Sequence, residues 1–295
     1  MAGRSDLPAG GSCLRLLNEG VCPPAVNMAR DYALLEAFQR GEIPPTLRVY
    51  QWASPALTYG VNQQLPPRLI DACQSLGIPM FRRPTGGKAV LHGHDLTVAL
   101  VFGYESALTP LSPLSRAAGE GGIDAPLPPC GRGAGGEGNI PRLYPQDTRI
   151  GHNGRVLGEG NIPRLYPRQV YQRLAPALVE AFRMVGAPAA QGDAPAPDPR
   201  GMDDGGDCFA TPAIADIVHA ETGVKLMGCA LLVRGAHVLM QASIPLRLPD
   251  VPVERLFGHP HPPPPPLDAD ALTDALYRTL TRLMHTPASA INTAP

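Results

Sequence analysis

Apolar residues recur with a helical period near the start of the chain. The residues at this spacing of three and four are Met28, Tyr32, Leu35 and Phe38. They predict an amphipathic helix that runs from a cap at Asn27 to about Arg40, with Gly41 at its end. Shorter apolar segments predict a short helix at 67–76 and strands at 47–52, 57–59, 78–83, 89–91 and 96–102.

The second half of the chain carries similar patterns. Amphipathic helices are predicted at 170–185 and 268–285. Between them, three apolar segments separated by glycine-containing turns predict a meander of strands at 213–220, 224–233 and 237–244. Antiparallel strand pairs mixed with separate helices predict an α+β fold, with a central mixed, largely antiparallel β-sheet and flanking helices.

A low-complexity insert interrupts this pattern at 105–167. It is rich in proline, glycine and serine, and it contains an identical ten-residue repeat at 136–145 and 158–167. Two copies are too few for a solenoid, and the segment has little to bury, so we expect a disordered surface loop. We therefore predict one catalytic-size domain over 1–295 that carries this insert, with a second flexible segment at 186–206.

Composition narrows the range of partners. The formal net charge is −1 and gives no electrostatic reason to expect nucleic acid or a membrane surface. No apolar segment reaches the length of a membrane span, and the start of the chain lacks the apolar core of a signal peptide, so we expect a cytoplasmic protein. The six cysteines form no Cys-x-x-Cys pair, which predicts free thiols, no disulfide framework and no metal site.

The segment at 82–92 carries the first candidate chemistry. It reads Arg-Arg-Pro-Thr-Gly-Gly-Lys-Ala-Val-Leu-His, and Asp95 and Thr97 follow it. Paired glycines let a backbone approach a ligand closely, and amide groups next to cations can bind a phosphate or a carboxylate. A Gly-Gly pair between strands is also typical of an ordinary hairpin turn.

A second group of candidates lies on and before the meander. Lys225 stands inside an apolar strand, where its charge needs a partner unless the side chain points to solvent. Cys208 lies upstream in the segment Asp-Cys-Phe-Ala-Thr-Pro; it is either an inert buried thiol or a nucleophile whose pKa a nearby ammonium would lower. Cys229 is the competing thiol, because strand alternation puts it on the same face as Lys225.

The segment at 82–92 resembles the signature Arg-Arg-x-Thr-Gly-Gly-Arg-Ala-Val-Leu-His of the biotin/lipoate A/B protein ligase family. The segment at 223–233 resembles the second motif of that family, and the Cys-Phe-x-x-Pro segment resembles the one that carries the nucleophile in its octanoyltransferase branch. The resemblance implies the class II synthetase-like fold of biotinyl and lipoyl ligase catalytic domains. It also implies two catalytic residues, Cys208 and Lys225. The implied substrate-binding residues are Arg82, Arg83, Thr85, Gly86, Gly87, Lys88, Ala89, His92, Thr97 and Gly228.

Three functions follow from the resemblance. The first is an acyltransferase of protein lipoylation, which would move octanoyl from acyl carrier protein through Cys208 to a lysine of a lipoyl domain or a glycine-cleavage carrier protein, with no ATP and no metal. The second is a lipoate-protein ligase, which would use free lipoate, ATP and Mg²⁺; the ligase branch has glycine where Lys88 stands. The third is an inactive acyl- or carrier-binding relative, because Leu231 and Val233 replace the glutamine and arginine of the second motif.

Overall fold

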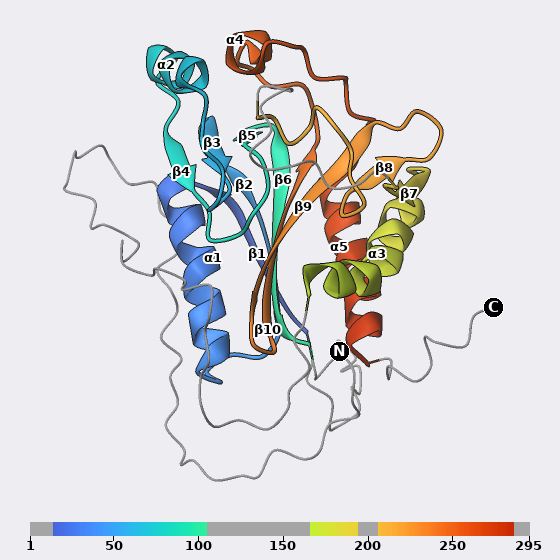
Figure 1. Ribbon diagram of the computed structural model, residues 1–295. Helices are drawn as coiled ribbons and strands as arrows, with labels where there is room; N and C mark the ends of the chain where they lie inside the picture. Colours follow the sequence, from blue (N-terminus) through green and yellow to red (C-terminus); the bar gives the residue numbers. More distant parts are fainter. Residues whose placement is uncertain (1–13, 105–165, 194–205, 286–295) are drawn as a thin grey trace, which may run out of the picture.

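The computed structural model describes residues 14–104, 166–193 and 206–285 (Figure 1). The described strands are β1 (Arg15–Cys22), β2 (Thr46–Trp52), β3 (Ala56–Tyr59), β4 (Met80–Arg82), β5 (Val90–His92), β6 (Asp95–Gly103), β7 (Ala189–Gln191), β8 (Ile217–His219), β9 (Lys225–Arg234) and β10 (His237–Pro245). The described helices are α1 (Pro24–Gln39), α2 (Pro67–Ser75), α3 (Pro167–Met184), α4 (Val253–Phe257) and α5 (Ala269–His285).

Seven of the described strands form one sheet in the order β1-β2-β6-β10-β9-β8-β7. The β1–β2 pair is parallel, and every other neighbouring pair of this sheet is antiparallel. The remaining three strands form a small sheet in the order β4-β3-β5. The predicted α+β fold with a central, largely antiparallel sheet is therefore confirmed, and strands from both sides of segment 105–165 join the same sheet.

Strand alternation divides the large sheet between two apolar layers. Leu47 and Val49 of β2 pack into the main core with α3 and α5 on one face. Tyr50 and Trp52 lie in a second core with α1 on the other face. Figure 1 shows the same arrangement, with α1 on one side of the sheet and α3 and α5 on the other. Because both faces are covered, the strands are apolar on both sides.

The small sheet forms a third apolar core with α2 and α4, which lie together at one end of the molecule (Figure 1). Its strand β5 stands close to the α1 face of the large sheet, where His92 stacks on Trp52 with ring centroids 4.0 Å apart. The two sheets thus approach each other beside α1, and the space between them is the place where a ligand can lie.

The predicted cap of the first helix is wrong. The helix begins at Pro24, and Pro23 is its N-cap residue. Proline suits the first helical position because its φ angle is already helical and it has no amide hydrogen to leave unpaired. Asn27 is instead buried inside α1, where its side-chain amide donates to the carbonyl oxygens of Cys22 and Gln51 at 3.2 and 3.1 Å.

The strand predicted at 213–220 is only Ile217–His219 in the structure. Its first half is a turn, since the amide of Ala213 donates to the carboxylate of Asp216 at 2.7 Å and the amide of Asp216 donates back to the Ala213 carbonyl at 2.9 Å. Three elements were not predicted: β1, β7 and α4. The strand β7 and the helix α4 have three and five residues, too few to show a period, and β7 lies in the segment expected to be flexible.

The insert predicted at 105–167 falls almost wholly outside the described residues, as does the repeat within it. Its last two residues are described, and Pro167 is the first residue of α3. Among the described cysteines, Cys73, Cys208 and Cys229 are free thiols. Cys22 is disulfide-bonded, so the expectation of free thiols is wrong at that position. Sequence spacing alone does not show which cysteines a fold brings within bonding distance.

Candidate active site

A pocket with about 420 Å³ of unfilled space lies between the two sheets, beside α1. The apolar part of its wall comes mainly from α1, β2, β5 and the β9–β10 hairpin. The lining residues are Met28, Tyr50, Trp52, Thr58, Arg83, Gly87, Val90, His92, Thr97, Cys208, Gly228, Cys229, Ala230, Gln241, Ala242 and Ser243. Six of the residues predicted from the sequence are therefore brought together, namely Cys208, Arg83, Gly87, His92, Thr97 and Gly228.

The glycine turn is held together by Arg83. Its guanidinium donates to the hydroxyl of Thr58 at 2.8 Å and to the carbonyl oxygens of Gly86 and Lys88 at 3.0 and 2.9 Å. Gly87 has a φ of 88°, which other residues rarely adopt. Burial lowers the pKa of Arg83 to about 10. The arginine thus shapes the turn that forms one wall of the pocket.

The other predicted residues of this segment do not line the pocket. Arg82 is exposed and donates to the carbonyl of Val61. Thr85 is buried and donates to the side-chain oxygen of Gln241 at 2.9 Å. Lys88 is buried, and Ala89 pairs with the backbone of the segment that carries Cys208. These residues therefore fix the turn to neighbouring segments and do not face the pocket.

Backbone pairing places Cys208 beside the turn. The amide of Cys208 donates to the carbonyl of Ala89 at 2.8 Å, and the amide of Ala89 donates to the carbonyl of Gly206 at 2.9 Å. Two segments that are more than a hundred residues apart thus form a parallel bridge. The bridge brings the thiol to the pocket that the glycine turn lines.

Lys225 lies next to this thiol. Its ammonium nitrogen Nζ lies 3.9 Å from Cys208 Sγ and also donates to the carbonyl oxygen of Cys208. The same nitrogen forms an ion pair of 2.7 Å with the carboxylate of Asp216, and both side chains are buried. Asp216 was not predicted from the sequence, because the apolar residues before it indicated a strand and no motif marks it.

The pKa of Cys208 differs from the expectation. Burial raises the pKa of Cys208, and this effect outweighs the nearby ammonium of Lys225, so the expectation of a lowered pKa is wrong. Burial by itself lowers the pKa of Lys225, but interaction with Cys208 and with the carboxylate of Asp216 raises it overall. The lysine therefore keeps its charge at neutral pH, and the cysteine rests as a thiol.

Gly228 has no side chain, and this leaves room for the thiol of Cys208. A Cβ atom at this position would lie 3.1 Å from Cys208 Sγ, closer than side-chain atoms normally approach. The next residue, Cys229, also lines the pocket, and burial raises its pKa well above the usual value. No lysine nitrogen lies within hydrogen-bond distance of the Cys229 sulfur among the described residues, which distinguishes it from Cys208.

His92 and Asp95 form a buried hydrogen-bond network at the wall of the pocket. The ring nitrogens Nδ1 and Nε2 of His92 lie 2.8 Å from the carboxylate of Asp95 and 2.8 Å from the hydroxyl of Thr58. Asp95 also accepts from the hydroxyls of Thr97 and Ser243 at 2.9 and 2.7 Å. Burial raises the pKa of Asp95, but His92 and these donors lower it overall. Both nitrogens of His92 are engaged, which is typical of a positioning residue.

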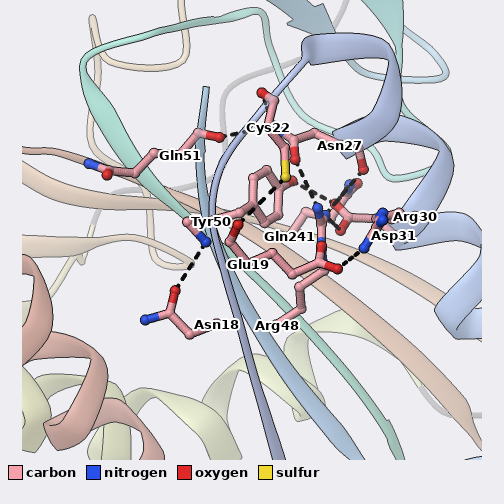
Figure 2. Close-up of polar contacts among 11 residues, drawn as sticks. Asn18, Glu19, Cys22, Asn27, Arg30, Asp31, Arg48, Tyr50, Gln51 and Gln241 are labelled. Carbon is pink, nitrogen blue, oxygen red and sulfur yellow. Dashed lines mark hydrogen bonds and ion pairs between the residues drawn. The ribbon is translucent and has the colours of Figure 1, made fainter. Parts of the chain in front are cut away.

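A second buried network lies beneath α1, and Figure 2 shows it. Asp31 accepts from the guanidinium of Arg48 at 2.6 Å, from the hydroxyl of Tyr50 at 2.8 Å and from the amide of Gln241 at 2.6 Å. Arg48 is also paired with Glu19 at 2.6 Å. Tyr50 and Gln241 line the pocket, so this network holds two side chains of its wall in place.

The two departures from the second motif have a packing explanation. Leu231 and Val233 pack against the main core, on the side of α3 and α5, and neither lines the pocket. Apolar side chains at these positions therefore leave Cys208, Lys225 and the pocket wall unchanged. Among the described residues, no cluster of three or more His, Cys, Asp or Glu side chains could hold a metal ion, and no helix is long and apolar enough to cross a membrane.

Known proteins match the part of the chain that carries the glycine turn. Residues 23–112 match the model of the lipoyl protein ligase A/B catalytic domain. The octanoyltransferase LipM of Geobacillus kaustophilus is 43% identical over 88 residues, which are 30% of this chain and 32% of that protein. LipM of Lysinibacillus sphaericus is 45% identical over 86 residues, 29% of this chain and 31% of that protein. The sequence matches thus span about a third of the length of these relatives.

The fold extends the similarity beyond the matched segment. A bi-partite lipoate protein ligase from Thermoplasma acidophilum has a TM-score of 0.54 at 18% identity and aligns over 92% of this chain and 83% of that one. Lipoate-protein ligase A bound with ATP has a TM-score of 0.54 at 18% identity, over 94% and 87% of the two chains. The fold is that of lipoate-protein ligase catalytic domains. Residues 23–112 are thus similar in sequence to the lipoyl protein ligase A/B catalytic domain, and the chain shares the fold of lipoate-protein ligases.

Proposed function

We propose that this protein is an octanoyltransferase of protein lipoylation that works through a thioester on Cys208. The observation that carries the proposal is the position of this thiol, which lines a largely apolar pocket and lies 3.9 Å from Lys225 Nζ. The match of residues 23–112 to the lipoyl protein ligase A/B catalytic domain, and the similarity of 88 residues to the octanoyltransferase LipM of Geobacillus kaustophilus, support the same activity. In this proposal the described residues form one catalytic domain, which segment 105–165 interrupts.

In the first half-reaction, the octanoyl chain occupies the pocket and its thioester carbonyl lies at Cys208. The sulfur of Cys208 attacks the carbonyl carbon, and the bond to the thiol of the acyl carrier protein breaks. The proton of the Cys208 thiol leaves with the departing thiol, so one thioester replaces another at little cost in free energy. Because burial raises the pKa of Cys208, the reaction begins from the thiol and the proton must move as the sulfur attacks.

Lys225 stabilises the charge that develops during this attack. Its ammonium lies beside the sulfur in a buried site, where a preorganised cation stabilises an oxyanion more strongly than water does. Asp216 holds the ammonium in place through the ion pair of 2.7 Å and offsets its burial. The glycine turn, shaped by Arg83, closes the wall along which the acyl chain lies.

In the second half-reaction, a lysine amine of a lipoyl domain, or of a glycine-cleavage carrier protein, attacks the octanoyl-Cys208 thioester. The products are an amide on the acceptor and the free Cys208 thiol. Both half-reactions exchange one acyl bond for another, so the proposed cycle uses no ATP and no metal ion.

Intact-protein mass spectrometry tests the proposal. The full chain is mixed with octanoyl-acyl carrier protein in EDTA and without ATP, and then with an apo lipoyl domain. We expect the mass of the protein to rise by one octanoyl group, and the lipoyl domain to take up that group afterwards. Cys208→Ala should show neither step, whereas His285→Ala, a substitution at the exposed end of α5, should show both.

The other two functions give different results. Modification of the lipoyl domain only after free lipoate and ATP are added, with full activity in Cys208→Ala, would make the protein a ligase and overturn the proposal. No transfer to either carrier protein under both conditions would make it an inactive relative. The structural neighbours include a ligase bound with ATP, which is why the ATP condition belongs in the test.

A further inference from the structure

A second pocket, with about 340 Å³ of unfilled space, lies on the other side of the reactive pair. It is built by the start of β9, the end of β10 and the segments that follow β10 and α4. Its lining residues are His94, Phe209, Val224, Lys225, Pro245, Arg247, Leu248, Pro249, His261, Pro262 and Pro264. None of these residues lines the first pocket.

The two pockets meet at Cys208 and Lys225. Cys208 lines the first pocket and Lys225 lines the second, and their sulfur and nitrogen atoms lie 3.9 Å apart. Phe209, the residue after Cys208, also lines the second pocket. A group in the second pocket is therefore within reach of a carbonyl carbon that is bonded to the Cys208 sulfur.

The wall of the second pocket suits the aliphatic part of a lysine side chain better than the amide-containing arm of pantetheine. Six of its residues have aliphatic side chains: Val224, Pro245, Leu248, Pro249, Pro262 and Pro264. Proline has no amide hydrogen, so four of these six residues offer no backbone donor. A pantetheine arm carries amide groups that need such partners, whereas the four methylene groups of a lysine side chain need none.

The polar groups of this pocket are mostly engaged with the protein. Arg247 donates to the carboxylate of Asp250 at 2.6 Å and to the carbonyl of Gly93 at 3.0 Å. The Nε2 nitrogen of His261 lies 2.6 Å from the carboxylate of Asp207. Lys225 is paired with Asp216. These contacts use the charged groups to hold the loops, which leaves His94 as the histidine with an unused nitrogen.

His94 is buried, with 5% of its surface exposed, and its Nδ1 nitrogen has no hydrogen-bond partner among the described residues. An unpaired buried polar atom is uncommon and costs free energy, so it commonly marks the place of a ligand. Burial also lowers the pKa of His94 to about 4, which keeps its ring neutral at physiological pH. A neutral ring whose Nδ1 carries no proton accepts a hydrogen bond.

We propose that the second pocket receives the side chain of the acceptor lysine and that His94 Nδ1 accepts a hydrogen bond from its amine. This assignment rests on the proposed function. The cation of Lys225 next to the pocket disfavours a second ammonium, so the lysine reacts as the neutral amine. With one N–H group bound to His94, the lone pair of the amine remains available for the thioester carbonyl.

The step is balanced without a co-reactant. The amine nitrogen forms a bond to the carbonyl carbon, and the bond between that carbon and the Cys208 sulfur breaks. The proton that the nitrogen loses ends on the sulfur, so the products are an amide and a thiol. His94 directs the amine and is unchanged at the end.

Single-turnover kinetics test the assignment, with the two half-reactions measured separately by mass spectrometry on the full chain. His94→Ala should load octanoyl on Cys208 at a rate within about twofold of the unmodified protein, and its discharge to an apo lipoyl domain should fall about tenfold or more, the effect of one lost hydrogen bond. His94→Asn, which keeps an acceptor atom near the position of Nδ1, should recover most of that loss. Val224→Phe, which fills the pocket, should also slow discharge to the lipoyl domain.

Controls separate the possible outcomes. His285→Ala should change neither half-reaction, and hydroxylamine should discharge octanoyl-Cys208 from His94→Ala at the unmodified rate. If His94→Ala and Val224→Phe slow loading as strongly as discharge, the donor thiol arm occupies this pocket and the assignment is wrong. Normal discharge in both variants also overturns it, while the proposed function stands. If the unmodified protein forms no octanoyl-Cys208, the proposed function fails and this assignment fails with it.

Discussion

The glycine turn and the reactive pair beside it use their polar groups differently. On the wall formed by the glycine turn, Arg83 gives its donors to Thr58, Gly86 and Lys88 within the wall itself. His92 likewise uses both ring nitrogens on Asp95 and Thr58. Polar groups satisfied in this way fix the shape of a site and have little capacity left for a substrate.

The segment that pairs with this turn keeps a reactive group. Cys208 has a free thiol, and the ammonium of Lys225 lies beside it and is held in place by Asp216. The lesson is that the most recognisable motif of the sequence builds the pocket, while less conspicuous residues carry the proposed chemistry. Substitutions in the turn should therefore cost mainly stability, and substitutions around Cys208 should cost mainly rate.

Lys225→Met should have the largest effect. Loss of the cation should slow octanoyl loading of Cys208 by about 10³-fold, as removal of an oxyanion-stabilising group does. The variant also leaves Asp216 buried and unpaired, so its free energy of unfolding should fall. The double variant Lys225→Met/Asp216→Asn should regain stability and stay slow, which denaturant unfolding and loading kinetics measure together. Regained loading in the double variant would contradict the role of Lys225.

Arg83→Met should lower the stability of the protein more than it lowers the rate of octanoyl loading. Three acceptors of the turn would lose their donor, so the free energy of unfolding should fall by about 3 kcal/mol. Loading by the folded protein at low temperature should fall by about tenfold at most, because the arginine does not contact the reacting sulfur. Urea unfolding and single-turnover loading measure the two effects. A loss of rate near that of Lys225→Met, with stability unchanged, would show that Arg83 binds the substrate.

The pH dependence of stability should report the burial of His94. Its pKa is lowered from 6.5 to about 4 in the folded protein, so between these values the unfolded chain binds a proton that the folded chain does not. The stabilising contribution of neutral His94 should therefore be complete above pH 6.5, and the free energy of unfolding should fall by about 3 kcal/mol as the pH drops to 4.

The lowered pKa of Asp95 acts in a separate window. The contribution of ionised Asp95 to the free energy of unfolding is complete above pH 3.8, the ordinary pKa of an aspartate, and is lost only at lower pH. His94→Asn should consequently flatten the pH profile of urea unfolding between 4 and 6.5 and leave the acid limb below 4 in place. An unchanged slope in the upper window would contradict the buried neutral state of His94.

Gly228→Ala tests the space around the thiol. The new Cβ atom would lie 3.1 Å from Cys208 Sγ, so the sulfur must shift by a few tenths of an ångström from its position beside Lys225. We expect loading to slow by about tenfold with little change in the free energy of unfolding. Ala230→Gly, two residues along the same strand, is the control for altered strand propensity. Equal loading in Gly228→Ala and the unmodified protein would show that the thiol position is not critical.

Cys229→Ala should have the smallest effect. This thiol lines the pocket, but no lysine nitrogen lies within hydrogen-bond distance of it among the described residues. Burial holds its pKa well above the ordinary value, so it should not form a thioester. Octanoyl loading should stay within about twofold of the unmodified rate. A loss comparable to that of Cys208→Ala would reverse the assignment of the two cysteines.

The sequence allowed the fold class and half of the site to be predicted. The apolar segments of β2, β6 and β10 showed where the sheet lies, and the segment at 82–92 indicated the turn from its glycines. The two signals that pointed to Cys208 and Lys225 were family motifs. The structure adds the distance between the two side chains, which no local pattern contains.

Other residues of the site could not be predicted because their partners are distant in the sequence. Asp216 is an ordinary acidic residue until the fold sets it 2.7 Å from Lys225. Asp31 and Gln241 are 210 residues apart and meet beneath α1. Asn27 is a residue type that often caps helices, but here it is buried within the first turn of α1 and its side chain donates to carbonyl oxygens of β1 and β2. Similarly, the lowered pKa expected for Cys208 failed because the depth of burial is a tertiary property.

The most direct test of the central claim is to locate the acyl group on the chain. The full protein is loaded from octanoyl-acyl carrier protein without ATP, digested under conditions that preserve thioesters, and its peptides are sequenced by mass spectrometry. The octanoyl group should lie on the peptide that contains Cys208, in the unmodified protein and in Cys229→Ala alike. An octanoyl group on Cys229, or no acylated peptide under these conditions, would contradict the account.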